Sequence, residues 1–238
     1  MMWWQVAVIA AVVVVAAALQ GSIGFGLGML VAPVVAVIDP TVLPGIVIII
    51  AIVVTMIVAV RERSSLDLAG AGWALIGRVP GSCAGAWLVS VLPSSGLAWL
   101  VAIVVLAGVG LSVIGWSPVP TRANLITAGA ASGVMGTATS IGGAPMALIW
   151  QRSEGPRLRG TMAAFFLVGS LISLALLIAF GTITAATLSL AAWLLPAALA
   201  GYALSRFTNR LLTRRRLRTA ALAASAFGAI FVIVAQLL

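Results

Sequence analysis

Two glycine-rich stretches interrupt long apolar runs and decide how this chain folds. The first reads Gln20-Gly21-Ser22-Ile23-Gly24-Phe25-Gly26-Leu27-Gly28 and leads to Pro33. The second reads Ser132-Gly133-Val134-Met135-Gly136-Thr137-Ala138-Thr139-Ser140-Ile141-Gly142-Gly143-Ala144-Pro145. Glycine and proline at this density disfavour a continuous helix. We therefore predict a broken helix at each stretch, with a second apolar element that begins at Gly21.

The sequence around these stretches is that of an integral membrane protein. Of its 238 residues, 63% are hydrophobic and 7% are charged, whereas a soluble domain carries about 25% charged residues. This composition excludes a soluble enzyme, a DNA-binding module and a disordered regulator. Runs such as 42–60 and 220–238 lack the alternation of a membrane β-strand. We expect an all-α integral membrane protein.

Polar residues, glycines and prolines divide the chain into ten apolar elements. They are 3–19, 21–38, 42–60, 69–91, 96–115, 124–139, 140–151, 161–180, 184–205 and 219–237. The first element resembles a signal peptide, but its start lacks the positive charge of one. We interpret it as the first membrane helix. The second and seventh elements are either short spans or arms of re-entrant hairpins.

The arginines predict the orientation of these elements. If the N-terminus lies outside and each element reverses direction, the inside loops are 61–68, 116–123, 152–160 and 206–218. These loops hold all but one of the 13 basic residues, as the positive-inside rule requires. The net charge of +9 is therefore explained by topology, without nucleic acid as a partner. Both termini are predicted outside, and the cluster Arg214-Arg215-Arg216 would lie at the inner lipid surface.

The first five elements match the last five in order. Residues 80–88 align with 196–204 without a gap, with four of nine positions identical. Because each unit has an odd number of elements, the second copy must be inverted in the membrane, as in many secondary transporters. We predict repeat one at 1–116, an inside linker at 117–123 and repeat two at 124–238.

The two breaks are the strongest candidates for a binding site. Broken helices expose backbone N–H groups, which are tolerated in a membrane only where they line a cavity or bind a ligand. Helix N-termini favour anions, and hydroxyls of Ser22, Thr137, Thr139 and Ser140 stand beside them. The alternative is that small residues merely let helices pack closely. That alternative is preferred for Gly77, Gly81 and Gly85, and for Gly129 with Gly133.

Arg78 is the second candidate, because it is the one arginine outside the predicted loops. An arginine within a membrane segment costs at least about 2.5–3.5 kcal/mol and is therefore a functional hypothesis. No acidic residue lies within an element interior, so an unpaired guanidinium is available to grip a small oxyanion. The alternative is that Arg78 reaches the inner surface or caps carbonyls freed by Pro80.

The residue types that are missing restrict the chemistry further. The chain has no histidine, and its four acidic residues lie outside the element interiors. Proton relays in membranes commonly use Asp, Glu or His, so tight proton coupling is not expected. There is no P-loop for ATP. We expect no enzyme activity, no metal and no cofactor.

These motifs resemble those of the TauE/SafE family of membrane permeases, the sulfite-exporter-like proteins. The resemblance rests on Gln20, Gly24, Gly26 and Gly28 in the first stretch and on Gly136, Gly142, Gly143 and Pro145 in the second. Arg159 with Thr161, Phe165-Phe166 and Gly181 also fit. The resemblance implies two inverted halves, a bacterial inner membrane and export of sulfite, sulfoacetate or related organosulfonates.

We therefore expect a permease that exports a small sulfur oxyanion by alternating access. The expected substrate-binding residues are Gln20, Ser22, Gly24, Phe25, Gly26, Gly28, Arg78, Gly136, Thr137, Thr139, Ser140, Gly142 and Gly143. Export of one negative charge gains about 2.3 kcal/mol at 100 mV, negative inside. An uptake carrier, a channel and a non-transporting assembly subunit remain alternatives. Stripes of small residues permit a homodimer in the lipid bilayer.

Overall fold

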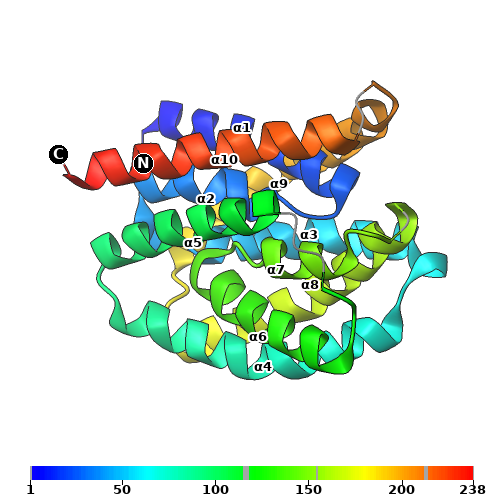
Figure 1. The fold of residues 1–238 in the computed structure, drawn as a ribbon. Helices are drawn as coiled ribbons and strands as arrows, with labels where there is room; N and C mark the ends of the chain where they lie inside the picture. The colour runs from blue at the N-terminus through cyan, green and yellow to red at the C-terminus, as the bar shows by residue number, and fades with distance from the viewer. Residues whose placement is uncertain (1, 115–117, 154, 212–213, 238) are drawn as a thin grey trace.

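A computed structural model describes residues 2–114, 118–153, 155–211 and 214–237. Within these ranges the chain forms ten α-helices and two short 3-10 helices, and no strand (Figure 1). The α-helices are α1 (Trp3–Ile23), α2 (Leu27–Ile38), α3 (Gly45–Arg61), α4 (Leu68–Val91), α5 (Ser94–Ile114), α6 (Arg122–Thr139), α7 (Gly143–Trp150), α8 (Gly155–Ala179), α9 (Ala185–Leu211) and α10 (Arg214–Leu237). The 3-10 helices are η1 (Pro40–Val42) and η2 (Arg63–Ser65). The prediction of an all-helical chain is confirmed.

Five of the described helices, α1, α4, α5, α8 and α9, are long and apolar enough to cross a membrane. Others are shorter: α3 has 17 residues, α2 has 12 and α7 has eight. At a rise of 1.5 Å per residue, α2 is about 18 Å long and α7 about 12 Å, against a hydrocarbon core of about 30 Å. The multi-pass membrane interpretation is supported, and neither α2 nor α7 crosses such a core alone.

The first break lies later in the chain than its glycines suggest. Gly21 and Ser22 belong to the last turn of α1, so the expected start of a second element at Gly21 was wrong. The helix ends where the backbone enters the left-handed region, at Gly24 with φ 90° and Gly26 with φ 116°. Only glycine adopts such angles freely. Gly21 has ordinary helical geometry, so density of glycine alone does not end a helix.

The second break is likewise shorter than expected. The segment from Ser132 to Thr139 remains helical in α6, and the break consists of Ser140, Ile141 and Gly142. Ser140 adopts φ 64°, the one non-glycine residue with a positive φ among those described. Its amide donates to the carbonyl of Gly136 at 2.9 Å, as the Gly24 amide donates to Gln20 at 2.9 Å. The two breaks thus share one cap geometry.

The two breaks also occupy equivalent places in the chain. Three residues separate α1 from α2, and three separate α6 from α7. Ile23 and Thr139, which end α1 and α6, are 116 positions apart, as are Leu27 and Gly143, which begin α2 and α7. The prolines inside α4 and α9, Pro80 and Pro196, have the same separation. One offset therefore relates helix ends, helix starts and interior prolines.

Small residues bring α4 and α6 into close parallel contact. A Cβ atom added to any of the five glycines in this interface would come within 2.8 Å of a backbone carbonyl oxygen of the other helix. They are Gly77, Gly81, Gly85, Gly129 and Gly133. The same kind of contact brings Gly201 of α9 against the Val14 carbonyl of α1. The expectation that these α4 and α6 glycines serve packing agrees with this geometry.

We expect Gly81→Ala to destabilise the protein by about 1–3 kcal/mol, because the new methyl would overlap the carbonyl of Ala130. Thermal unfolding of the detergent-solubilised protein measures the effect. Gly72→Ala is the matched control, since Gly72 lies in the same helix with no atom within 4 Å of its added Cβ. The control should be neutral or slightly stabilising. Equal melting temperatures for the two variants would contradict the close packing.

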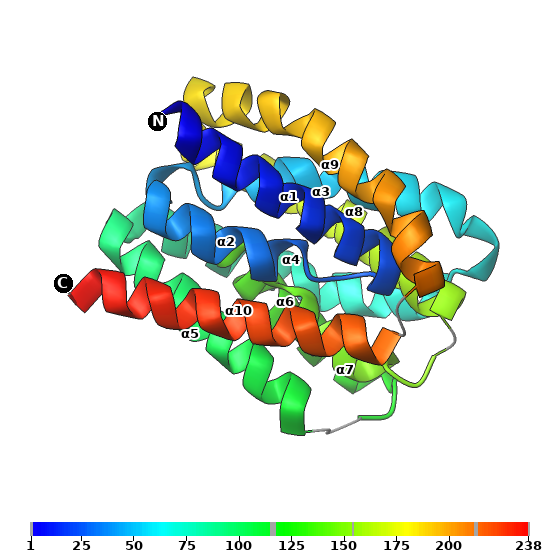
Figure 2. The ribbon, with the colours of Figure 1, turned by 90° about the horizontal axis from the view of Figure 1, so that it is seen from above.

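The start of α1 and the end of α10 lie at one end of the bundle, and the connection from α3 to α4 lies at the other (Figures 1 and 2). At that far end Arg159 of α8 donates to Glu62 through Nη2 at 2.8 Å and Nε at 3.2 Å. Arg157 lies 3.4 Å from Asp67. These pairs join the first half of the chain to the second. The expected boundary at 116 and 117, and the side chains of Arg214, Arg215 and Arg216, lie outside the described residues.

Candidate functional site

The two breaks, far apart in sequence, meet in the middle of the fold. A Cβ atom on Gly28 of α2 would overlap the carbonyl of Ser140 in the second break. A Cβ on Gly143 of α7 would lie 3.1 Å from the Cβ of Phe25 in the first break. The first contact leaves no room for a side chain at Gly28, and the second leaves little room at Gly143. The breaks therefore contact each other directly, with no side chain between these points.

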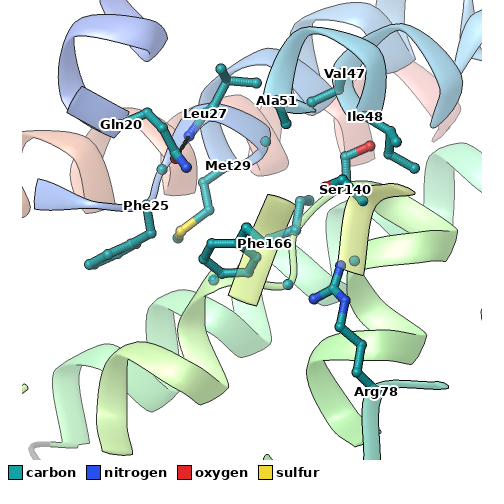
Figure 3. Close-up of a pocket in the computed structure, with 17 residues that line it drawn as sticks. Gln20, Phe25, Leu27, Met29, Val47, Ile48, Ala51, Arg78, Ser140 and Phe166 are labelled. Carbon is teal, nitrogen blue, oxygen red and sulfur yellow. Dashed lines mark hydrogen bonds between the residues drawn. The ribbon is translucent and has the colours of Figure 1, made fainter. Parts of the chain in front are cut away.

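A cavity of about 50 Å³ lies where the breaks meet (Figure 3). Its walls come from both breaks, from the start of α3 and from the middle of α4 and α8. The lining residues are Gln20, Phe25, Gly26, Leu27, Gly28, Met29, Val47, Ile48, Ala51, Arg78, Gly136, Ser140, Ile141, Gly142, Gly143, Phe166 and Ser170. Most of these residues are buried. The cavity is therefore lined mainly by residues from the interior of the bundle.

Nine of the residues expected from sequence line this cavity. They are Gln20, Phe25, Gly26, Gly28, Arg78, Gly136, Ser140, Gly142 and Gly143. Both breaks and the interior arginine thus converge on one place, although the sequence separates the two breaks by more than a hundred residues. Whether these residues bind a substrate stays a prediction.

Four expected residues lie outside the lining. The hydroxyls of Ser22 and Thr139 donate to carbonyls one turn earlier in their own helices, at 2.7 and 2.6 Å. Thr137 is hydrogen-bonded to Ser173 of α8 at 2.7 Å. Gly24 faces the backbone of Arg159, whose Cα would lie 3.2 Å from an added Cβ. These four residues shape the breaks or join helices rather than face the cavity.

Sequence reasoning missed several wall residues. Val47, Ile48 and Ala51 form the α3 wall, and no polar or glycine pattern distinguishes them from other apolar residues. Met29 lines the cavity as well. The sequence singles out Phe166 only as part of a family-like motif. Ser170 follows Gly169 within the apolar run of α8. This pair of small residues was the one feature of the sequence that could have indicated a wall residue there.

The two short helices present their N-terminal ends to this region. Gly26 and Gly142 precede α2 and α7, and neither helix has a side-chain cap from its own N-cap residue. The side chain of Gln20 supplies one acceptor, because its Oε1 accepts from the amide of Leu27 at 3.3 Å. Helix N-termini carry free N–H donors and partial positive charge. Both ends therefore favour a negative group.

Arg78 is buried in the wall, with 2% of its surface exposed. Its Nη1 donates to Ser132 Oγ at 3.0 Å, and its guanidinium carbon lies 4.8 Å from the ring centre of Phe165 and 5.6 Å from that of Phe166. The side chain runs against Gly169, where an added Cβ would overlap Nε. Figure 3 shows the guanidinium directed from α4 toward the second break.

No carboxylate neutralises this guanidinium among the residues the structure describes. The salt bridges there involve Glu62 and Asp67, at the far end of the bundle, and Nε of Arg78 has no hydrogen-bond partner. A buried charge without a partner is costly. A small anion in the adjoining cavity would offset that cost and could accept bonds from the guanidinium and from helix N-termini together.

A comparison with known protein families gives one match. The family model described as sulfite exporter TauE/SafE matches residues 9–232. The match covers both breaks, Arg78 and every cavity-lining residue, so the resemblance inferred from the glycine motifs is confirmed. No curated protein and no solved structure matches the chain.

Proposed function

Because the chain belongs to the TauE/SafE sulfite exporter family, we propose that it exports small sulfur oxyanions, with sulfite foremost, by alternating access. The substrate would occupy the cavity between the two breaks. Arg78 would supply the positive charge. Amides in the first turns of α2 and α7 would bind the oxygens of the substrate, apart from the Leu27 amide, which already donates to Gln20. Ser140 and Ser170 also line the cavity, and the Ser140 hydroxyl donates to the carbonyl of Pro44 at 3.0 Å.

The observation that carries this proposal is the buried guanidinium of Arg78, which no described carboxylate neutralises, at the wall of the cavity. A purely structural arginine in a membrane is expected to pair with a carboxylate or reach the surface. Arg78 does neither among the described residues, since it is buried and its one side-chain hydrogen-bond partner is neutral Ser132. A bound anion would supply the negative partner that Arg78 lacks among the described residues.

The size of the cavity favours a compact anion. At about 10–15 Å³ for one water molecule, a cavity of about 50 Å³ holds about three to five water-sized groups. Sulfite consists of one sulfur and three oxygens and matches that number. Sulfoacetate and taurine carry additional atoms and would require the walls formed by Met29 and Phe25 to move.

The helix contacts support two inverted repeats of five helices. With the 116-residue offset, α1 corresponds to α6 and α4 to α9, and the largest contacts join α1 to α9 and α4 to α6. The pairs α3–α9 and α4–α8 correspond in the same way, as do α2–α10 and α5–α7. A two-fold relation between the halves generates this list of pairs. Secondary transporters with such repeats bind substrate between the halves.

The lengths of α2 and α7 favour re-entrant arms over full spans. Each arm would start at a break inside the membrane and return to the side from which the preceding helix entered. Rocking of one half against the other would then open the cavity to either side. We place the chain in a bacterial inner membrane with both termini outside, which puts the arginine-rich loops in the cytoplasm. The membrane potential then drives export.

Efflux of sulfite from reconstituted proteoliposomes tests the proposal. Vesicles loaded with sulfite should release it faster with the protein than without, and an inside-negative potential should accelerate release. Counterflow of labelled sulfite is expected for a carrier. Sustained single-channel current would instead show that the protein is a channel and does not work by alternating access. Absence of both sulfite flux and sulfite-induced thermal stabilisation would refute the proposed function.

A further inference from the structure

We infer that Ser132 of α6 is a positioning residue: it aims the guanidinium of Arg78 at the anion and joins it to the backbone of the second break. The inference rests on the proposed function of the cavity and assigns a role to a residue outside its lining. Ser132 is completely buried. Its partners come from α4 and from the residue that precedes α7.

The hydrogen bonds of Ser132 have one possible direction each. A guanidinium only donates, and a carbonyl oxygen only accepts. Ser132 Oγ therefore accepts from Arg78 Nη1 at 3.0 Å and donates its single proton to the carbonyl of Gly142 at 2.7 Å. The hydroxyl proton is thus fully engaged. Ser132 therefore links the Arg78 guanidinium to the backbone of Gly142, the residue that precedes α7, through two hydrogen bonds.

The other contacts of Arg78 hold its position but do not fix its orientation. The rings of Phe165 and Phe166 attract the guanidinium through their faces, and Gly169 leaves space for the side chain. Neither contact is directional in the plane of the guanidinium. Because that group is planar and rigid, a bond to Nη1 orients Nη2 as well. Nη2 lies on the cavity side, 3.4 Å from a Cβ that would replace a hydrogen of Gly136.

The bond to Gly142 links this orientation to the break itself. A Cβ on Gly142 would lie 2.7 Å from the backbone oxygen of Ser132, so the two backbones are in close contact. Any movement of the α6–α7 break would shift the acceptor on which Ser132 depends. The cation and the N-terminal end of α7 would therefore move together, and the anion would be held or released by both at once.

Ser132→Ala tests this role in two backgrounds. In the wild-type chain we expect the half-saturating sulfite concentration to rise about tenfold, because one charge-assisted hydrogen bond is lost. In an Arg78→Lys chain we expect Ser132→Ala to change it less than twofold, since a compact ammonium needs no orientation in a plane. If Ser132 were only structural, Ser132→Ala would raise the half-saturating sulfite concentration by the same factor in both backgrounds.

Ser82→Ala is the matched control. Ser82 is equally buried, lies one turn beyond Arg78 on α4, and its hydroxyl has no hydrogen-bond partner in the described structure. Its removal should leave sulfite affinity unchanged. Ser132→Cys, which keeps a weak donor and acceptor at similar size, should fall between Ser132→Ala and wild type. If Ser132→Ala fails to fold, the sulfite affinity of Ser132→Cys still tests the role of the hydroxyl.

The outcomes separate this inference from the proposed function. If the wild-type chain binds sulfite but Ser132→Ala and Ser132→Cys bind it equally well, Ser132 does not position Arg78 and the cavity proposal stands. Equal factors for Ser132→Ala in the wild-type and Arg78→Lys backgrounds would also overturn the inference. If the wild-type chain neither binds nor transports sulfite, the proposed function itself is wrong.

Discussion

Arg78→Ala is expected to reduce sulfite transport at least about 100-fold while leaving the protein folded. The guanidinium would contribute two charge-assisted bonds to the anion, each typically about 1.5–3 kcal/mol, and each 1.4 kcal/mol corresponds to a factor of about ten. Initial efflux rates from proteoliposomes at several sulfite concentrations measure the loss. Arg157→Ala is the control, because Arg157 is exposed at the far end of the bundle and pairs with Asp67.

Arg78→Lys and Arg78→Leu sharpen this prediction. Lysine keeps a charge but lacks the planar fork, so we expect intermediate transport. Leucine removes a buried charge that no described carboxylate compensates, and such replacements are often neutral or stabilising. We therefore expect Arg78→Leu to melt at the same or a higher temperature while losing transport. Full transport by either Arg78→Ala or Arg78→Leu would remove the guanidinium from the site.

A stable variant without transport would identify Arg78 as a functional residue rather than a structural one. Buried charges that cost stability persist where function needs them. The structure supports this interpretation through what surrounds Arg78. Gly169 makes space, two aromatic rings contact the guanidinium, and Ser132 accepts one bond, but none of these groups carries a negative charge.

The sequence was sufficient to predict the helices and the approximate breaks, because apolar length and glycine density act locally. It was insufficient to locate the ends of the breaks. Gly21 and Gly24 look alike in sequence, yet only Gly24 takes a positive φ. That difference depends on the tertiary position of the residue: Gly21 packs against Ser205 and Tyr202 of α9, whereas Gly24 lies where the chain must turn toward α2.

The candidate site shows the same division between local and tertiary information. Arg78 was found because a single arginine in an apolar element is conspicuous without any contact map. Ser22, Thr137 and Thr139 lie outside the cavity lining. A hydroxyl on a helix either faces a cavity or bonds within the protein, and sequence spacing alone does not distinguish the two. Ser132 opens the second glycine-rich stretch but was not expected to contribute to the site, since its partners lie 54 and 10 positions away.

Gly28→Ala is expected to reduce sulfite transport at least about tenfold and to lower the melting temperature. Gly28 lies in ordinary helical geometry within α2, so alanine meets no backbone strain there. Its Cβ would nevertheless overlap the carbonyl of Ser140, and relieving that overlap would separate the two breaks by about the width of a methyl group. A displacement of this size enlarges the distance between the N-terminal ends of α2 and α7, and binding groups tolerate little misplacement.

Gly110→Ala is the matched control, because Gly110 lies within α5 and no atom stands within 4 Å of its added Cβ. Sulfite-induced thermal stabilisation should remain unchanged in Gly110→Ala and shrink in Gly28→Ala. If Gly28→Ala transports sulfite as well as the control does, the breaks do not need to touch in any state that binds the anion. A loss of binding without a loss of folding would instead mean that contact between the breaks forms the site, since the substitution leaves Arg78 and every polar side chain of the cavity in place.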